Sequence, residues 1–193
     1  MRTLSRQFLA ALRAFLVLSV LLGLLWPFAF TAVAQVAAPA QANGSLIRTA
    51  DGTVVGSSLL GQKTEGPQWF APRPSDSDYA GDTSGSSQLS PVSGEHLATV
   101  QERRDALMAE NPHARGPVPA DALAGSSSGL DPHISPEYAA WQTPRIAEAR
   151  GMSEADVAAI VARHTQGRTL GFLGQPRVNV TELNADLAAH AGR

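Results

Sequence analysis

The sequence predicts an α+β protein with one N-terminal transmembrane helix, followed by a single extracytoplasmic domain of short strands and about four helices. Three observations carry this prediction. Residues 14–36 form an uncharged apolar run. Asp51-Gly52, a dipeptide favoured in tight hairpin turns, separates two short runs with strand character. The rest of the chain carries helix caps and apolar residues at helical spacing.

Composition narrows the classes of function. The 193 residues contain no cysteine, which excludes disulfides, thiolate metal sites and thiol catalysis. Three of the 15 basic residues lie in the first 36 positions, where there is no acidic residue. The remainder is therefore mildly acidic, and it gives no electrostatic reason to expect a nucleic-acid partner.

The apolar run is long enough to cross a membrane. A helix over residues 14–36 spans roughly 35 Å, compared with about 30 Å for a hydrocarbon core, and Pro27 is a candidate kink that membrane helices tolerate. Arg2, Arg6 and Arg13 precede the run, and the next basic residue is Arg48. The positive-inside tendency then predicts a cytoplasmic segment 1–13, a spacer 37–45 and an extracytoplasmic domain 46–193.

A cleaved signal peptide is the alternative interpretation of the same run. Ala32-Val33-Ala34 satisfies the small-residue cleavage pattern before Gln35. The length of the apolar run favours a retained anchor. Both interpretations place residues 40–193 outside the cytoplasm.

The first half of the outer domain combines a hairpin, a long loop and a helix. Residues 46–48 and 53–55 flank the Asp51-Gly52 turn, and residues 76–91 are rich in Ser, Gly and Asp, which predicts a loop. Apolar residues at helical spacing predict an amphipathic helix over 95–109, which Asn111-Pro112 ends.

The second half has clearer boundaries. Ser135 followed by Pro136 predicts a helix start, Pro144 is expected to break or restart this helix, and Gly151 fits its end. Ser153 is expected to cap a further helix that reaches His164. We expect residues 170–174 to pack closely on the core as a strand or loop, residues 178–180 to form a short strand, and a terminal helix to follow.

Several ordered motifs resemble the C subunit of the Kdp-type potassium-transporting ATPase, and the resemblance spans nearly the whole chain. The most specific matches are residues 130–136 (LDPHISP), 144–147 (PRIA), 149–151 (ARG) and 167–180 (GRTLGFLGQPRVNV). Shorter matches occur at residues 56–62 (GSSLLGQ), 69–75 (WFAPRPS), 84–89 (SGSSQL) and 118–121 (VPAD).

The resemblance implies a non-catalytic accessory subunit of a high-affinity, ATP-driven potassium uptake complex in the bacterial inner membrane. Such a subunit supports assembly and acts as a catalytic chaperone that raises the ATP affinity of the ATPase subunit. The implied partners are a channel-like potassium-binding subunit, the P-type ATPase subunit, a small membrane subunit and the lipid bilayer. ATP and K⁺ are then ligands of the complex, and no cofactor is assigned to this chain.

Family-motif positions are the candidate site residues, with structural or partner-contact roles. They are Arg73, Asp121, Asp131, His133, Arg145, Arg177 and Asn179. Arg73 lies between two prolines and is expected to pair with an acid of its own domain or of a partner. A second candidate is a nucleotide- or partner-binding loop formed by Ser84, Gly85, Ser86, Ser87 and Gln88. There the family usually has Gly at Ser86, which would be strained at a positive φ, and Asn at Gln88.

No catalytic or metal-binding set is predicted, because the five histidines lack ligand-like spacing. A membrane-anchored serine hydrolase remains the alternative function, with His133 near Ser126, Ser127 and Ser128, although no nucleophile elbow surrounds these serines. A binding module is the third. Residues 56–64 approach a phosphate-binding loop, but Gln62 interrupts the required Gly-Lys-Thr order, so a glycine-rich turn is the better interpretation.

Overall fold

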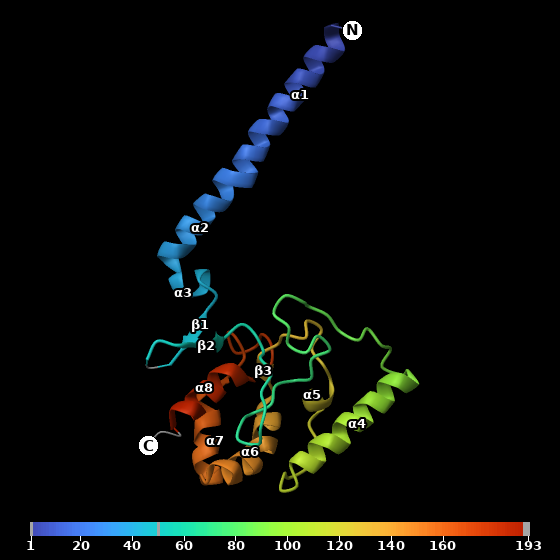
Figure 1. Ribbon diagram of the computed structural model, residues 1–193, viewed down its shortest axis with the longest axis vertical. Coiled ribbons are helices and arrows are strands. Elements are labelled where there is room, and N and C mark those ends of the chain that lie inside the picture. The colour runs from blue at the N-terminus through green and yellow to red at the C-terminus, as the bar shows by residue number, and fades with distance from the viewer. Residues whose placement is uncertain (1, 50, 191–193) are drawn as a thin grey trace. The chain divides into compact units, whose positions relative to one another are not determined.

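The computed structural model describes residues 2–49 and 51–190. It divides into two compact units, Met1–Ser45 and Leu46–Arg193. The two units are described separately below, as the N-terminal unit and the C-terminal unit. Figure 1 shows the elements of each.

The N-terminal unit is a long apolar helix. It consists of α1 (Arg2–Val20), a π-helical turn η1 (Leu21–Leu25), α2 (Trp26–Ala37) and the short α3 (Pro39–Ala42). The stretch Leu4–Ala37 has 34 residues, and an 18-residue window within it has a mean hydropathy of 2.5; its side chains are exposed or half-buried. By length and composition this helix can cross a membrane, and at about 51 Å it exceeds the roughly 30 Å hydrocarbon core.

Pro27 explains the π-helical turn. Proline has no N–H to donate, and its ring clashes with the carbonyl four residues earlier, here that of Gly23. The backbone widens before it, so that the N–H of Trp26 donates to the carbonyl of Leu21, five residues back. At the kink site predicted from Pro27, the helix therefore changes locally from α-helical to π-helical pitch.

The C-terminal unit contains four helices of ten or more residues within its described part, as the sequence predicts. These are α4 (Gly94–Glu110), α6 (Pro136–Arg150), α7 (Glu154–Arg163) and α8 (Val180–His190). The single-turn helix α5 (Ala120–Leu123) precedes α6. The segment between residues 58 and 93 is irregular, in agreement with the loop predicted at 76–91.

Two small antiparallel sheets complete the unit. The predicted hairpin forms the first, from β1 (Leu46–Arg48) and β2 (Val54–Ser57), with Leu46 opposite Ser57. The second has the order β3-β5-β4, from β3 (His133–Ile134), β5 (Arg177–Asn179) and β4 (Thr165–Gln166). The central strand β5 pairs Asn179 with His133 on one side and Val178 with Thr165 on the other.

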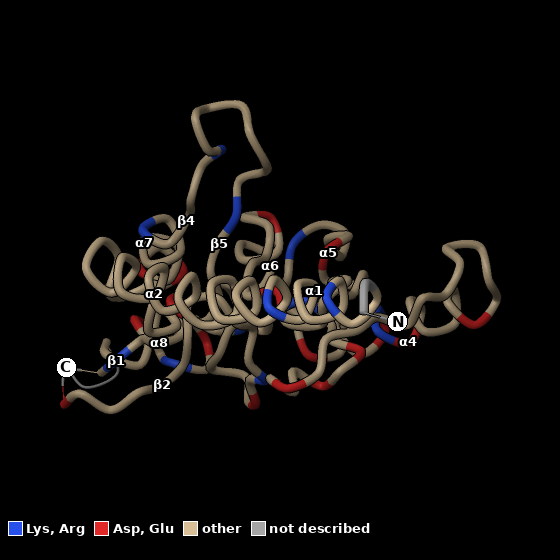
Figure 2. The backbone as a smooth tube through the Cα atoms, turned by 90° about the horizontal axis from the view of Figure 1, so that it is seen from above, with Lys and Arg blue, Asp and Glu red and all other residues tan. Residues whose placement is uncertain are grey.

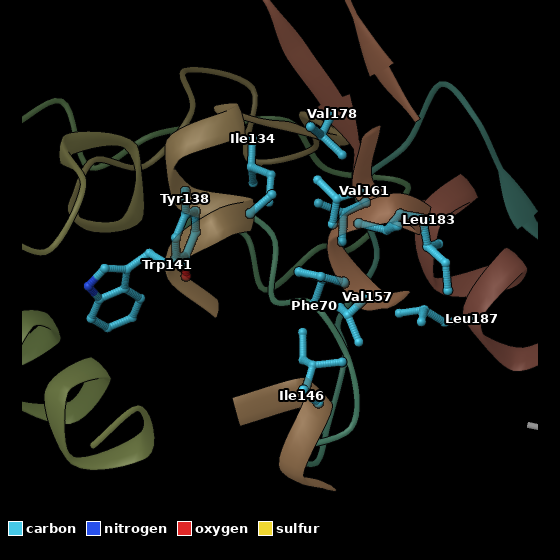
Figure 3. Packing of buried hydrophobic residues seen from close by; sticks show 14 of the residues in the cluster. Phe70, Ile134, Tyr138, Trp141, Ile146, Val157, Val161, Val178, Leu183 and Leu187 are labelled. Atoms are coloured by element: carbon cyan, nitrogen blue, oxygen red, sulfur yellow. The ribbon is translucent and has the colours of Figure 1, made fainter. Parts of the chain in front are cut away.

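The core lies where α6, α7, α8 and β5 meet. Figure 3 shows Val178, Val161 and Leu183 pointing toward one another, with Phe70 among them. Phe70 is fully buried although it belongs to the irregular segment. The core therefore depends on a residue that no helix or strand carries.

Local signals set the helix boundaries as predicted. The side chains of Ser135 and Ser153 accept hydrogen bonds from the N–H groups of Tyr138 and Asp156, at the starts of α6 and α7. Gly151 ends α6 in the left-handed conformation, with φ of +64°.

Pro144 does not break or restart α6, so that prediction is wrong. The helix continues from Pro136 to Arg150 with Pro144 inside it. An interior proline destabilises a helix by about 3 kcal/mol. Trp141 before it and Ile146 and Ala147 after it are all buried in the core. Their burial offsets the lost hydrogen bond and keeps both halves in one helix.

Helix α4 forms over the predicted residues, and its half-buried Leu107 packs against the core, whereas Leu97 and Met108 are 56% and 57% exposed. One further expectation about packing is wrong. Residues 170–174 do not pack on the core, because Leu170 and Phe172 are 78% and 70% exposed. Periodicity identifies which side chains share a face, but it does not determine whether another element covers that face.

Candidate functional site: two arginine clusters of the C-terminal unit

Arg73 joins the irregular segment to the loop before α6. Its Nη1 lies 3.2 Å from Asp131 Oδ2, and its guanidinium also donates to the carbonyl oxygens of Ala124 and Gly125. The Tyr79 hydroxyl donates to the carbonyl of Arg73 at 2.5 Å, and burial raises the pKa of Tyr79 to about 12. Of the two predicted partners for Arg73, the structure has the acid of its own domain.

Asp131 connects Arg73 to His133. Its Oδ1 accepts a hydrogen bond from the His133 backbone N–H at 3.0 Å and lies 3.1 Å from His133 Nδ1. Partial burial by itself raises the pKa of Asp131, but the hydrogen bonds from His133 and the charges of His133 and Arg73 outweigh it. The net pKa is lowered, so Asp131 is a carboxylate near neutral pH. We refer to Arg73, Asp131 and His133 as the Arg73 cluster.

Gly61 lies against this cluster, which explains the glycine-rich turn at residues 56–64. Its N–H donates to the Leu130 carbonyl at 2.7 Å, and a Cβ at Gly61 would lie 2.7 Å from the carbonyl oxygen of Asp131. Lys63 pairs with Asp78 at 3.0 Å on an exposed surface. The glycine therefore permits close contact of two backbone segments, and the lysine has an internal partner.

Asp121 positions the cap of α6. One carboxylate oxygen accepts from the Ser135 N–H at 2.7 Å and the other from the Ser135 hydroxyl at 2.9 Å. The Ser135 oxygen can then accept from the N–H of Tyr138 at 2.9 Å. The motif residue Asp121 thus fixes the direction in which α6 begins.

Arg145 forms the second cluster, with Asn111, Gln142 and the backbone of residues 67–69. Its guanidinium donates to Asn111 Oδ1 at 2.7 Å, to Gln142 Oε1 at 2.9 Å, and to the carbonyl oxygens of Pro67 and Trp69 at 2.6 and 3.2 Å. Burial lowers the pKa of Arg145 from its usual value. We call this set the Arg145 cluster. It holds the irregular segment and the end of α4 against α6.

Gln142 and Arg150 also attach the irregular segment to α6. Neither residue was among the candidates predicted from the sequence. Gln142 exchanges two hydrogen bonds with the backbone of Ala71, at 2.7 and 3.1 Å. Arg150 donates to the carbonyls of Gln68 and Leu187 and lies 4.4 Å from the ring centroid of Trp69. The spacing of Gln142, Arg145 and Arg150 along α6 was the available signal, but their partners are distant in the sequence.

Asn179 and Arg177 lie on β5 and face different surroundings. Asn179 is buried; its Nδ2 donates to the Ser58 carbonyl at 2.7 Å, and its Oδ1 accepts from the N–H of Glu182 at the start of α8. Arg177 is half-buried at the other end of the strand, opposite Gln166. Asn179 therefore braces the fold, whereas Arg177 lies where the chain leaves the core.

The candidate loop 84–88 meets the serine-rich loop before α6. The N–H of Gly85 donates to the Ser128 carbonyl, and the N–H of Ser87 donates to Asp76, whose other carboxylate oxygen lies 3.0 Å from Arg103. The residue at positive φ is Gln88, at +52°, and not Ser86. The strain anticipated for Ser86 thus falls on Gln88.

The hydrolase alternative has a specific geometric requirement, a serine hydroxyl bonded to His133. The described His133 side chain instead contacts Asp131, and Ser128 Oγ accepts from the N–H of Leu130 within its own loop. Ser126 is buried at 6% exposure. These contacts favour a bracing role for the motif.

Comparison with known proteins agrees with the motifs. The profile of the family "K+-transporting ATPase, c chain" matches residues 8–189. The chain is 51% identical over 180 residues to a potassium-transporting ATPase KdpC subunit of Sorangium cellulosum, covering 92% of this chain and 94% of that protein. It is 50% identical to the KdpC subunits of Kineococcus radiotolerans, over 97% and 96% of the two chains, and of Caulobacter vibrioides, over 89% and 87%.

These matches cover both the apolar helix and the two arginine clusters. The residues that brace the C-terminal unit are thus the ones that carried the resemblance in the sequence. The chain therefore belongs to the KdpC family, the c chain of the K⁺-transporting ATPase.

Proposed function

We propose that this chain is a non-catalytic accessory subunit of a high-affinity, ATP-driven potassium uptake complex, and that it supports assembly and raises the ATP affinity of the ATPase subunit. The observation that supports this most directly is the use of the motif residues. Arg73, Asp131, His133 and Arg145 are all bonded to groups of the chain itself. They stabilise a rigid body that a partner can recognise.

The partners are the channel-like potassium-binding subunit, the P-type ATPase subunit and a small membrane subunit of the same pump. ATP and K⁺ bind at the level of this complex. Residues 84–88 serve as a partner loop in this proposal, since the N–H of Gly85 holds them against the serine-rich loop and the N–H of Ser87 holds them against Asp76.

The orientation follows from charge. Arg6 and Arg13 lie at the N-terminal end of the helix Leu4–Ala37, whose remaining length is uncharged, so the N-terminus is cytoplasmic and the C-terminal unit extracytoplasmic. Protease added to intact spheroplasts should cut the C-terminal unit and leave the helix in the membrane. A C-terminal unit that is cut only in inverted vesicles would refute this orientation.

The helix docks on the membrane subunits through its small residues Gly23, Ala29 and Ala32, which permit close approach. A Cβ at Gly23 meets no described atom of the chain within 4 Å, so a larger residue there leaves the helix itself undisturbed. Replacing all three by leucine should abolish co-purification with the pump. Val17, Val20 and Val36 replaced by leucine make a control of equal helical length and similar hydrophobicity, which should co-purify normally.

An ATP titration tests the central claim. The pump is purified with and without this chain, and K⁺-stimulated ATP hydrolysis is measured over a range of ATP concentrations. We expect the KM for ATP to be lower when the chain is present, because the chain is proposed to raise ATP affinity. An outer domain can act on a cytoplasmic site only through the complex, so the assembled pump has to be used. An unchanged KM in a complex that has retained the chain would contradict the chaperone role and leave only assembly.

A further inference from the structure

The connection between β4 and β5 is a projecting, apolar loop. Residues 166–176 are all exposed, and the loop extends away from the rest of the C-terminal unit in Figure 2. Its apex carries Leu170, Phe172 and Leu173, which are 78%, 70% and 48% exposed. We name residues 167–176 the hairpin tip. Three large apolar side chains together on one projection are unusual for a surface that stays in water.

The hairpin tip has a fixed shape. Thr169 and Leu173 exchange two backbone hydrogen bonds of 2.9 Å, and the N–H of Gly171 donates to the Arg168 carbonyl at 3.0 Å. Its base is β5, whose Val178 is fully buried in the core. A docking element of this kind loses little conformational entropy on binding, because it is already ordered.

The apex carries an apolar side chain where the backbone disfavours one. Leu170 has φ of +55° and Gly171 has φ of +82°, the signs of a type I′ turn, for which Asn-Gly is the preferred pair. A leucine in the left-handed region is destabilising by roughly 1–2 kcal/mol. Local strain of this kind is concentrated at functional positions, where the side chain has a use that offsets it.

The charged residues of the tip and its base have one sign. Residues 166–178 contain Arg168 and Arg177 and no acidic residue, although the domain as a whole is mildly acidic. Arg163, at the end of α7, is not part of this set, because it pairs with Asp186 at 3.1 Å. Figure 2 shows basic but no acidic segments between β4 and β5. A surface complementary to this tip combines an apolar pocket with a rim of carboxylates.

We propose that the hairpin tip docks into an apolar, acid-rimmed pocket on the extracytoplasmic surface of a membrane-embedded subunit of the same pump, an inference that rests on the proposed function. A preformed and strained turn suits a pocket of defined shape. A fluid lipid surface would accept the same side chains without that strain. The helical anchor and the hairpin tip then give the chain two attachments to one complex, and each raises the effective concentration of the other.

Photocrosslinking in the assembled pump identifies what covers the tip. A benzoylphenylalanine replaces Phe172 in the full chain, and in a control it replaces Leu97 of α4, which is 56% exposed. After irradiation we expect an adduct between position 172 and a membrane-embedded subunit of the pump, and none from position 97. Adducts to phospholipid alone, or no protein adduct at 172 in an intact complex, would overturn the proposal. If the unmodified chain does not co-purify with the pump at all, the proposed function itself fails.

A substitution with opposite effects on stability and docking provides the second test. Leu170→Asn suits the left-handed backbone, so the melting temperature of the chain should stay the same or rise. Its dissociation from the pump should be faster by about tenfold or more, as expected when a large apolar side chain loses a buried contact. Leu97→Asn is the matched control and should leave dissociation unchanged. A Leu170→Asn chain that dissociates at the wild-type rate would overturn the proposal.

Discussion

Among substitutions of half-buried residues in the C-terminal unit, Arg145→Ala should be the most destabilising. The substitution removes four charge-assisted hydrogen bonds, to Asn111, Gln142 and the carbonyls of Pro67 and Trp69. The Pro67 carbonyl is exposed and can bind water instead, but the other three acceptors are partly buried. At about 1–1.5 kcal/mol for each of these three, the free energy of unfolding should fall by roughly 3–4 kcal/mol.

Two further variants separate the hydrogen-bond geometry from the charge. Arg145→Lys keeps the positive charge but cannot reproduce the planar guanidinium fork, so we expect it to lose about half as much stability. Arg115→Ala is the control, because Arg115 pairs with Glu154 at 3.1 Å but is 80% exposed. An exposed ion pair contributes less than about 1 kcal/mol.

Denaturant unfolding of the full chain in detergent, followed by tryptophan fluorescence, measures these differences. Trp69 and Trp141 report on the C-terminal unit, and Trp26 lies in the separate N-terminal helix. For a unit of this size, a loss of 3–4 kcal/mol lowers the melting temperature by roughly 10 °C. The reasoning fails if Arg145→Ala is no less stable than Arg115→Ala.

Three other expectations follow from the same contacts. Gly61→Ala should lower the free energy of unfolding by about 1–3 kcal/mol, because the added Cβ would lie 2.7 Å from the Asp131 carbonyl oxygen. Gly81→Ala is the control in the same denaturant assay, because a Cβ at Gly81 meets no described atom within 4 Å. Gln88→Asn should raise the melting temperature slightly, by the equivalent of roughly 0.5–1 kcal/mol, since Asn tolerates the left-handed φ of +52°, whereas Ser86→Gly should give no gain. Asp131 has a lowered pKa in the folded state, so the stability it contributes is present above its unfolded pKa of about 3.8 and is lost as the pH falls through the folded value. In a profile of stability against pH, the loss of stability at acid pH should therefore be less steep in Asp131→Asn than in the wild type. An unchanged slope would refute this assignment.

The sequence predicts the elements whose signals are local. The caps at Ser135 and Ser153, the left-handed Gly151 and the hairpin at Asp51-Gly52 each depend on side chains and backbone groups within about four residues. The apolar helix follows from composition alone. The motif residues could also be selected in advance, although their roles could not be derived from spacing.

Contacts between distant segments are what the sequence leaves open. Arg145 contacts the backbone of residues that precede it by more than seventy positions, and Asn179 contacts Ser58 across 121 positions. No periodicity encodes such pairs, because they arise only when the irregular segment closes over α6 and β5. For the same reason, the sequence did not reveal the burial of Trp141 and Ile146 around Pro144, and a proline expected to break or restart the helix lies inside it.

The exposed side chains of α4 and the hairpin tip show most clearly what the sequence determines and what the tertiary structure determines. Their apolar residues are evident in the sequence, which predicted an amphipathic helix for α4 and close packing on the core for residues 170–174. Whether an apolar face is covered depends on the packing of the whole unit, which leaves Leu97, Leu170 and Phe172 in solvent. The sequence by itself determined the apolar N-terminal helix, the capped elements and the family. The tertiary structure alone decided which apolar side chains form the core and which remain exposed, because burial is a property of three-dimensional neighbours.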